Sequence, residues 1–507
     1  MGNDDSGRCV RTFKYLPVSS IGMPLPPLTK ISDVLWEIPT SYKRGMNVPA
    51  RVYADEEMLK GMEDAVFDQL TNIAVLPGIQ KHALCMADGH SGYGFPVGGV
   101  AAFDPEEGGI ISPGAIGYDI SCGMRLIKTN MTVEQVQPRI KKIVDELFKK
   151  VPTGVGCKGF LNLSQRQYKE VLMGGAGWAV EQGYGWENDL ECIEDKGVLK
   201  NADVSKVSSN ALKRGIDQLG TLGSGNHYLE VQLVTAGKIY DSKVAKKFGI
   251  TGEDQVVLMI HCGSRGVGHQ ICSDYTKIFN EKQKEYSFEI PDKQLACAPF
   301  HSKEAQDYIG AMSCGANMAL ANRQIITHRI REVFEKEYGE DAESLGLELI
   351  YDVSHNIAKE EKYKIDGKNK NLIVHRKGAT RSFGPENSAL PKKYQETGQP
   401  VIVGGSMETG SYLLVGTKKA EEETFGSTLH GSGRLMSRTQ ARKEFSGEQI
   451  NRDMIAKGIY IKARSMVGLA EEAGRSYKSI DKVTEIMDRA GISRRVCALR
   501  PIGNIKG

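Results

Sequence analysis

Three histidines stand at the ends of apolar β-strand candidates, and glycine lies close to two of them, His227 and His261, in the chain. His261 directly follows one apolar run, His355 closes a second and His227 opens a third. The runs cover residues 255–260, 347–353 and 228–234. Side chains at strand ends converge on a cleft, because the sheet holds them rigidly at its edge. With only ten histidines in 507 residues, this pattern constrains the fold: the three strands have to end at one place.

Four glycine-rich segments surround these strand ends and indicate a phosphate site. They are residues 223–227, 261–266, 404–407 and 430–434. Because glycine has no side chain, such loops let backbone N–H groups approach a phosphate closely. The chain has no Walker A motif, so dispersed loops of this kind have to hold any nucleotide.

Asp119 and Cys122 add the ligand types that three imidazoles lack. They lie three residues apart, so one turn can bring both side chains to the same centre. A lone histidine is more often a satisfied structural residue, but a carboxylate, a thiol and three strand-end imidazoles together favour a metal site. Ligand softness alone points to zinc for such a set.

The rest of the chain predicts a mixed α+β fold. Thr132 and Gln135 form a capping box ahead of a helix with one apolar face, and a long helix is expected over about 303–336. A composition of 40% hydrophobic and 25% charged residues supports a large core. Residues 1–30 contain Ser and Pro without periodicity and predict a flexible extension, followed by one large domain over 31–507.

Net charge, cysteine spacing and the lack of long apolar segments say more about where the protein is found than about what it does. The net charge of +3 gives no basic field, so nucleic-acid binding has to come from local clusters. The ten cysteines contain no CxxC pair, and neither a signal peptide nor a long apolar run is present. A cytoplasmic protein is expected, and a nuclear one as well if the source is eukaryotic. The start Met1-Gly2 through Ser6 matches the myristoylation pattern, but one acyl chain anchors only weakly.

An ordered set of motifs resembles the RtcB family of RNA ligases, especially its archaeal and eukaryotic members. The likeness runs from about residue 30 to the C-terminus. The segments that carry it are 88–95, 119–122, 225–227, 261–266, 352–356 and 430–434. No single motif is specific, but the complete set in this order is.

The resemblance implies an RtcB-like fold of mixed sheets and surrounding helices, forming one catalytic domain around a dinuclear metal cleft. It implies two Mn²⁺ ions bridged by Cys122, with Asp119 and His227 on one ion and His261 and His355 on the other. It makes His430 the residue that becomes guanylylated by GTP. The implied reaction joins an RNA 2′,3′-cyclic-phosphate or 3′-phosphate end to a 5′-hydroxyl end, in tRNA splicing and RNA repair.

The resemblance also assigns a guanylate site and partners. The site would contain Asn226, His227, Tyr228, Leu229, Glu230, His355, Asn356, Gly404, Gly405, Ser406, Met407, Ser411, His430, Gly431, Ser432, Gly433 and Lys506. A penultimate residue such as Lys506 usually frays. The resemblance instead implies that the C-terminal tail folds back into the guanylate site. The implied partners are RNA ends such as tRNA halves, and an archease-type activator protein.

Two basic segments are candidates for RNA phosphate contacts, although solvated charged faces explain them almost as well. One contains Arg376, Lys377 and Arg381, and the other contains Arg434, Arg438, Arg442 and Lys443.

The chain departs from the family pattern at three places. Glu408 stands where glycine is usual, Leu429 replaces a common cysteine, and residues 384–386 replace a Pro-Pro pair. Glu408 is hypothesised to weaken GTP binding by adding a carboxylate near the guanylate pocket.

Three other interpretations compete. Residues 364–367 match the KxDG motif of lysine nucleotidyl transferases, but Asp366-Gly367 is also a favoured hairpin turn between two apolar runs, which is the interpretation preferred here. The same metal ligands could serve a two-metal phosphoesterase, which would release phosphate without GTP. A non-catalytic RNA-binding scaffold would leave the nucleophile and ligands without a role.

Overall fold

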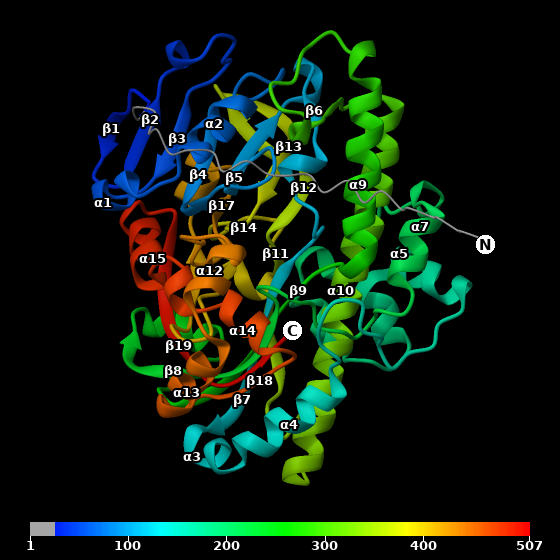
Figure 1. Ribbon diagram of the computed structural model, residues 1–507, viewed down its shortest axis with the longest axis vertical. Helices are drawn as coiled ribbons and strands as arrows, with labels where there is room; N and C mark the ends of the chain where they lie inside the picture. Colours follow the sequence, from blue (N-terminus) through cyan, green and yellow to red (C-terminus); the bar gives the residue numbers. More distant parts are fainter. Residues whose placement is uncertain (1–25) are drawn as a thin grey trace, which may run out of the picture.

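The computed structural model describes residues 26–507 (Figure 1). Most of the predicted extension, residues 1–25, lies outside this part of the chain. The first strand, β1, already begins at Thr29, two residues ahead of the predicted domain boundary.

Two large mixed sheets form the body of the protein and occupy the upper and lower parts of Figure 1. The first has the order β1-β2-β3-β4-β5-β13-β12, with bounds Thr29–Ser32, Leu35–Ile38, Ala50–Tyr53, Ala83–His90, Val97–Phe103, Lys368–Lys377 and Asn356–Ile365. The second has the order β11-β7-β9-β8-β19-β16-β15, with bounds Glu348–Ser354, Gly123–Thr132, Gln255–Cys262, Tyr228–Ile239, Ser493–Lys506, Ser411–Gly416 and Pro400–Val403. β18 (Tyr460–Ala463) pairs with β19 in parallel. The two-stranded sheets are β6 (Ile110–Ile111) with β10 (Ala298–Pro299), and β14 (Ala379–Arg381) with β17 (Ser427–Leu429).

A group of helices covers one side of the sheets, at the right of Figure 1. The longest is α10 (Lys303–Tyr338), where the Ser302 hydroxyl accepts a hydrogen bond from the Ala305 N–H at the start and Gly339 adopts φ 73° at the end. It packs against α5 (Gln165–Glu181) and α9 (Arg265–Lys282). The predicted capping box opens α3 (Val133–Val136), and α4 (Ile140–Lys150) buries the predicted apolar face. The other helices are α1 (Glu56–Lys60), α2 (Asp64–Ile73), α6 (Glu187–Leu190), α7 (Ser209–Gly215), α8 (Ser242–Lys247), α11 (Lys418–Glu423), α12 (Arg438–Glu444), α13 (Gly447–Ala456), α14 (Met466–Glu471) and α15 (Ile480–Arg489).

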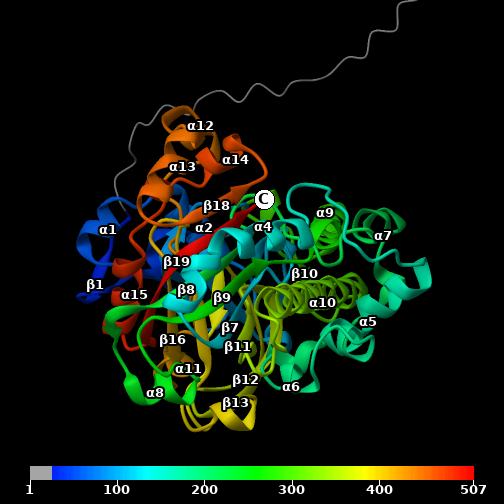
Figure 2. The same cartoon turned by 90° about the horizontal axis from the view of Figure 1, so that it is seen from below.

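The two sheets share one hydrophobic core, which makes them a single domain. Leu84 and Val100 of the first sheet belong to the same buried cluster as Leu126 and Tyr351 of the second. Burying a side chain of this size stabilises the fold by about 1.5–3 kcal/mol. A smaller cluster, which includes Met454 and Leu469, holds the lobe of α12, α13 and α14 that lies beside the C-terminus in Figure 2. Among the described residues, no helix combines the length and the apolar character needed to cross a membrane.

The chain crosses between the sheets where the predicted histidines lie. β11 of the second sheet and β12 of the first are separated by one residue, His355. His261 lies inside β9 and does not follow it, because the strand continues to Cys262. The turn at Asp366-Gly367 joins β12 to β13 with φ 47° and 81°, which confirms the hairpin interpretation. Lys364 is exposed on this hairpin.

Candidate metal centre and nucleotide pocket

The five predicted metal ligands come together between the sheets. The Cys122 Sγ atom lies 3.2 Å from His227 Nε2 and 3.3 Å from His261 Nε2. His261 Nε2 lies 3.3 Å from His355 Nε2, and an Asp119 carboxylate oxygen lies 2.8 Å from His227 Nε2. The ligand atoms of Cys122, His227 and His261 all lie within 4.8 Å of one another, and His355 and Asp119 extend this group at its two ends.

The backbone fixes this geometry. Cys122 N–H donates to the Asp119 carbonyl at 3.0 Å, and Ser121 between them has φ 54°, so a tight turn aims both side chains the same way. His355 N–H donates to the Cys122 carbonyl at 2.8 Å. The turn is thereby attached directly to the crossing point between the sheets.

The donor set suits divalent cations. The Asn226 carbonyl accepts from His261 Nδ1 at 2.9 Å, which leaves Nε2 with its lone pair facing the cluster. Burial holds the pKa values of His261 and His355 well below the usual range, so both rings are neutral ligands. Burial alone would raise the pKa of Asp119, but the His227 ring and neighbouring groups lower it to about 2. Burial raises the pKa of Cys122 to about 12, and a bound cation would favour the thiolate instead.

A buried ion network holds the cluster from behind. Asp352 lies between Arg125 and Arg323, with nitrogen–oxygen distances of 2.6 and 2.8 Å, and all three side chains are fully buried. Arg323 also donates to the carbonyls of Ser121 and Cys262 at 2.9 and 2.8 Å. The residues next to two proposed ligands are thus fixed by one guanidinium.

His430 lies beside the cluster, and its ring centroid is 4.7 Å from that of His355. The Asp88 carboxylate accepts from His430 Nδ1 at 2.6 Å and from the backbone N–H groups of His430 and Gly431 at 3.0 and 3.2 Å. Burial alone would raise the pKa of Asp88, but the His430 ring and these N–H groups lower it. The Asp88 carboxylate thus favours the tautomer with the proton on Nδ1 and leaves Nε2 with its lone pair.

Asp88 had no predicted role, although it opens the 88–95 segment that carries the family resemblance. It also stands at the end of an apolar run, next to Gly89. In the structure it lies near the end of β4.

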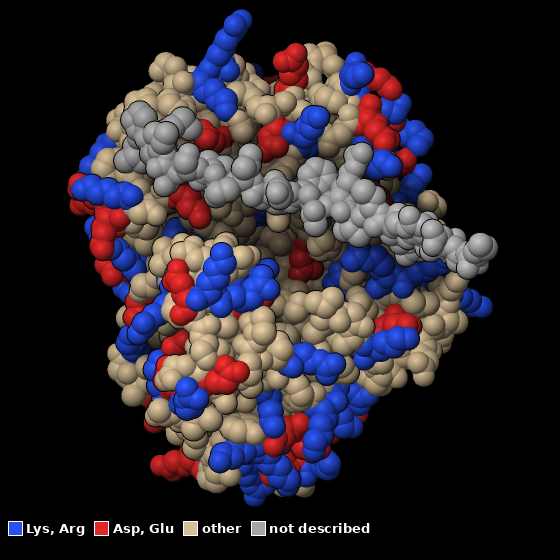
Figure 3. All heavy atoms as spheres, in the orientation of Figure 1, with Lys and Arg blue, Asp and Glu red and all other residues tan. Residues whose placement is uncertain are grey.

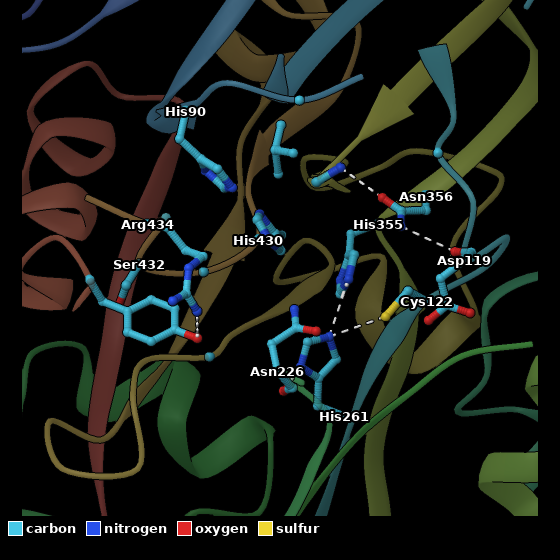
Figure 4. A pocket seen from close by; sticks show the side chains of 18 of the residues that line it. His90, Asp119, Cys122, Asn226, His261, His355, Asn356, His430, Ser432 and Arg434 are labelled. Carbon is cyan, nitrogen blue, oxygen red and sulfur yellow. Dashed lines mark hydrogen bonds between the residues drawn. The ribbon is translucent and has the colours of Figure 1, made fainter. Parts of the chain in front are cut away.

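A pocket of about 790 Å³ opens over His430 and the cluster (Figure 4). Most residues that the resemblance assigns to guanylate line it, namely Asn226, Tyr228, His355, Asn356, Gly404, Gly405, Ser406, Met407, His430, Gly431, Ser432, Gly433 and Lys506. Four others, His227, Leu229, Glu230 and Ser411, are buried behind this lining. Leu229 packs in the core, and Ser411 accepts from Gln232 at 3.1 Å. Glu230 accepts from Gln232 and Asn504, and burial raises its pKa to about 7.

The C-terminal tail folds back into the pocket, as predicted. Lys506 ends β19 and pairs with Tyr228 of β8. Its side chain is 4% exposed, and Nζ lies 3.6 Å from Glu472 and 5.3 Å from the Tyr228 ring centroid. The sheet register therefore fixes a residue that chain position alone would leave frayed.

Glu472 anchors the far wall of the pocket. Its carboxylate lies 3.3 Å from Arg434 Nη1 and 3.2 Å from Arg438 Nε, and it accepts a hydrogen bond from the Tyr477 hydroxyl. Neither Glu472 nor Tyr477 was singled out by the sequence, because no motif marks them.

The prediction of RNA phosphate contacts is wrong for two residues. Arg376 and Arg381 are buried, and they pair with Glu361 at 2.7 Å and Glu194 at 3.1 Å. Lys377 does line the pocket, and burial lowers its pKa to about 7. Arg434 and Arg438 line it too, whereas Arg442 and Lys443 are exposed on α12.

The three departures from the family pattern leave the pocket intact. Leu429 is fully buried in β17. Glu386 lies in an exposed loop with φ 69°. Glu408 does not line the pocket, since its carboxylate accepts from the Gly474 N–H and pairs with Lys457, both at 2.9 Å. The hypothesis that Glu408 weakens GTP binding stays a prediction, and the position of the carboxylate outside the pocket lining argues against it.

Comparison with known proteins agrees with this geometry. The family model described as "tRNA-splicing ligase RtcB" matches residues 69–507. The chain belongs to the RtcB family. It is 53% identical over 480 residues to an Archaeoglobus fulgidus protein named tRNA-splicing ligase RtcB, covering 95% of this chain and 99% of the relative. A Methanococcus maripaludis relative of the same name is 52% identical with the same coverage, and one from Thermococcus kodakarensis is 50% identical over 482 residues, with 95% and 99% covered.

Proposed function

We propose that this RtcB family member is a GTP- and Mn²⁺-dependent RNA ligase that joins a 2′,3′-cyclic-phosphate or 3′-phosphate end to a 5′-hydroxyl end through a His430–GMP intermediate. One observation carries the proposal. His430, hydrogen-bonded to Asp88 through Nδ1, stands beside the cysteine–histidine cluster in a pocket lined by glycine loops. A simple phosphoesterase needs only the cluster and water, whereas a positioned imidazole supplies a nucleophile.

The residues can be given roles in each step. His430 Nε2 attacks the α-phosphorus of GTP, a P–N bond forms, and the bond to pyrophosphate breaks. After water has opened a cyclic phosphate, an oxygen of the RNA 3′-phosphate attacks the same phosphorus and His430 leaves. The 5′-hydroxyl then attacks the activated RNA phosphate, and GMP departs. Asp88 holds the Nδ1 proton throughout, so the ring is returned neutral.

The residues in and around the pocket can be assigned to the metal ions and to the guanylate. Asp119, Cys122, His227, His261 and His355 would hold two Mn²⁺ ions, which when bound offset the charge of the phosphates. The glycine loops at residues 404–407 and 430–433 let a guanylate approach the backbone closely, and the cation of Lys506 favours its phosphate. The RNA substrates would be tRNA halves or broken RNA ends, and an archease-type protein would act as activator.

The decisive experiment ligates a cyclic-phosphate RNA to a 5′-hydroxyl RNA with wild type and with His430→Ala. Ligation by wild type should require GTP, and wild type should carry an acid-labile label from [α-³²P]GTP. The variant should show neither ligation nor label. Phosphate release without GTP would favour the phosphoesterase. If the label were stable to acid and absent from Lys364→Ala, the guanylylated residue would be Lys364 in the hairpin and not His430.

A further inference from the structure

Three aromatic rings line the pocket away from the guanylate loops. Tyr93 and Tyr118 meet edge to face, with centroids 5.8 Å apart and an interplanar angle of 83°. Tyr118 and His269 lie 4.9 Å apart at 32°. All three belong to the pocket lining, and Tyr93 is 61% exposed. An exposed tyrosine beside a candidate active site offers a π face and a hydroxyl group to a ligand.

The position of these rings relative to the cluster is defined by the chain. Tyr118 directly precedes Asp119, and His269 belongs to α9. Figure 4 shows Ser432 and Arg434 on one side of the pocket, Asp119 and Asn356 on the other, and His355 and His430 between them. The rings therefore belong to the Asp119 side, across the cluster from the wall that holds Glu472 and Lys506.

Lys377 fixes the backbone next to these rings. Its Nζ donates to the Tyr93 carbonyl and, at 3.0 Å, to the Gly114 carbonyl. The exposed Arg214 donates to Gln270, next to His269, at 2.7 Å. Figure 3 shows Lys and Arg side chains bordering the hollow in this face. Aromatic faces set among cations are what single-stranded RNA requires, because bases stack on rings while phosphates pair with cations.

We propose that Tyr93, Tyr118 and His269 form a stacking platform for the terminal nucleobase of an RNA end. The inference rests on the proposed function: with GMP on the Lys506 side, an RNA end that reacts beside His430 has to extend toward Asp119. Every base has a π face, so stacking holds an end without reading its sequence, as a ligase of varied ends requires.

The test compares Tyr93→Ala with Tyr93→Phe, which keeps the ring. Tyr42→Ala serves as a control, because Tyr42 is 39% exposed but does not line the pocket. Fluorescence anisotropy measures the Kd of short RNAs that carry either a 3′-phosphate or a 5′-hydroxyl at the end. We expect the Kd to rise roughly 10-fold in Tyr93→Ala, and to stay within twofold in Tyr93→Phe and Tyr42→Ala.

Abasic RNAs identify the stacked strand. One RNA lacks the terminal base of the 3′-phosphate strand, and the other lacks the terminal base of the 5′-hydroxyl strand. Wild type should bind one of these two RNAs roughly 10-fold more weakly than the intact strand. The same missing base should not weaken RNA binding by Tyr93→Ala any further. Unchanged RNA binding in Tyr93→Ala, or an equal abasic effect in both proteins, would overturn the platform.

Labelling of His430 by GTP without RNA separates the two proposals. Wild-type protein should be labelled in the absence of RNA, so this measurement tests the proposed function independently of the platform. Absence of label in wild type would defeat the proposed function, while the RNA-binding series would still decide the platform.

Discussion

The two walls of the pocket are held by different forces. The wall that carries the metal cluster consists of strand ends in the second sheet, and its buried charges, Asp352, Arg125 and Arg323, are all fully inaccessible. The opposite wall lies over the lobe of α12–α14, where Glu472 pairs with Arg434 and with Arg438, whose side chain is 46% exposed. One wall is fixed by a sheet and a deep core, and the other by the ion pairs of one buried carboxylate, of which the pair with Arg438 reaches the surface.

This difference matches what each wall has to do. Metal ligands need positions accurate to about half an ångström, which backbone hydrogen bonds between strands provide. A wall that admits a nucleotide has to adjust to its ligand, and regions with a small core and exposed ion pairs open at lower free energy. The cluster wall should therefore lose stability most when altered, and the lobe wall should change ligand binding more than folding.

The largest effect is expected for Asp352→Asn. The change removes the carboxylate between two fully buried guanidinium groups and leaves both without a full counter-charge. Removing one partner of such a network costs about 3–5 kcal/mol. Urea unfolding should show this loss relative to Glu340→Gln, an exposed carboxylate at the end of the long-helix region. A loss below about 1 kcal/mol would contradict the idea that buried charges fix this wall.

Acid unfolding tests the same wall at Glu194, whose carboxylate lies 2.7 Å from Lys359 and also accepts from the Ser354 N–H. Burial alone would raise its pKa, but Lys359 and Arg381 lower it to about 2. A carboxyl with a lowered pKa adds stability above its unfolded pKa of about 4.3 and loses it as the pH falls toward 2.

The stability lost between pH 5 and 2 should therefore be smaller in Glu194→Gln than in wild type, by up to about 3 kcal/mol. Unfolding at a series of pH values measures it. Parallel curves for the two proteins would show that Glu194 titrates normally.

Glu472→Gln examines the lobe wall. The change weakens the pairing of Arg434, Arg438 and Lys506. Because Arg438 is half exposed and water screens it, we expect a loss of only about 1–2 kcal/mol in stability. GTP binding should weaken more clearly, since Lys506 loses its anchor in the pocket. Glu471→Gln is the matched control, because Glu471 is 20% exposed and pairs only at the rim. Equal effects of the two changes on GTP affinity would remove the special role of Glu472.

Local patterns predicted much of the fold but not the sheet order. The long helix, the capping box and the Asp366-Gly367 hairpin follow from residues close in the chain, so the sequence marked them. In the second sheet, β7 (Gly123–Thr132) pairs with β9 (Gln255–Cys262), and β8 (Tyr228–Ile239) pairs with β19 (Ser493–Lys506). No local pattern encodes pairings between strands so far apart in the chain.

The residues of the candidate site also fall into two groups, those that the sequence indicated and those that only the structure shows. The histidines were found because they stand at strand ends, and the family resemblance supplied Lys506. Asp88 lies in a segment that carries the resemblance, but its contact with His430 is visible only in space. Glu472 is one of 63 acidic residues, and only its neighbours in space distinguish it. Arg376 and Arg381 were misassigned because an arginine in a sequence carries no sign of burial, while the packing of β13 and β14 places both beside buried carboxylates.

The smallest effect is expected for Glu408→Gly, which sharpens the contrast between the lobe and its pocket. Glu408 follows the glycine loop at 404–407, yet its carboxylate points to Gly474 and to Lys457, which is 52% exposed. Losing this surface pair and one hydrogen bond should cost about 1 kcal/mol or less. GTP affinity should stay within about twofold of wild type, because the carboxylate lies outside the pocket lining. Titration of labelled GTP measures the affinity. A clearly higher GTP affinity in the variant would mean that the negative charge of Glu408 disfavours nucleotide binding from its position in the lobe.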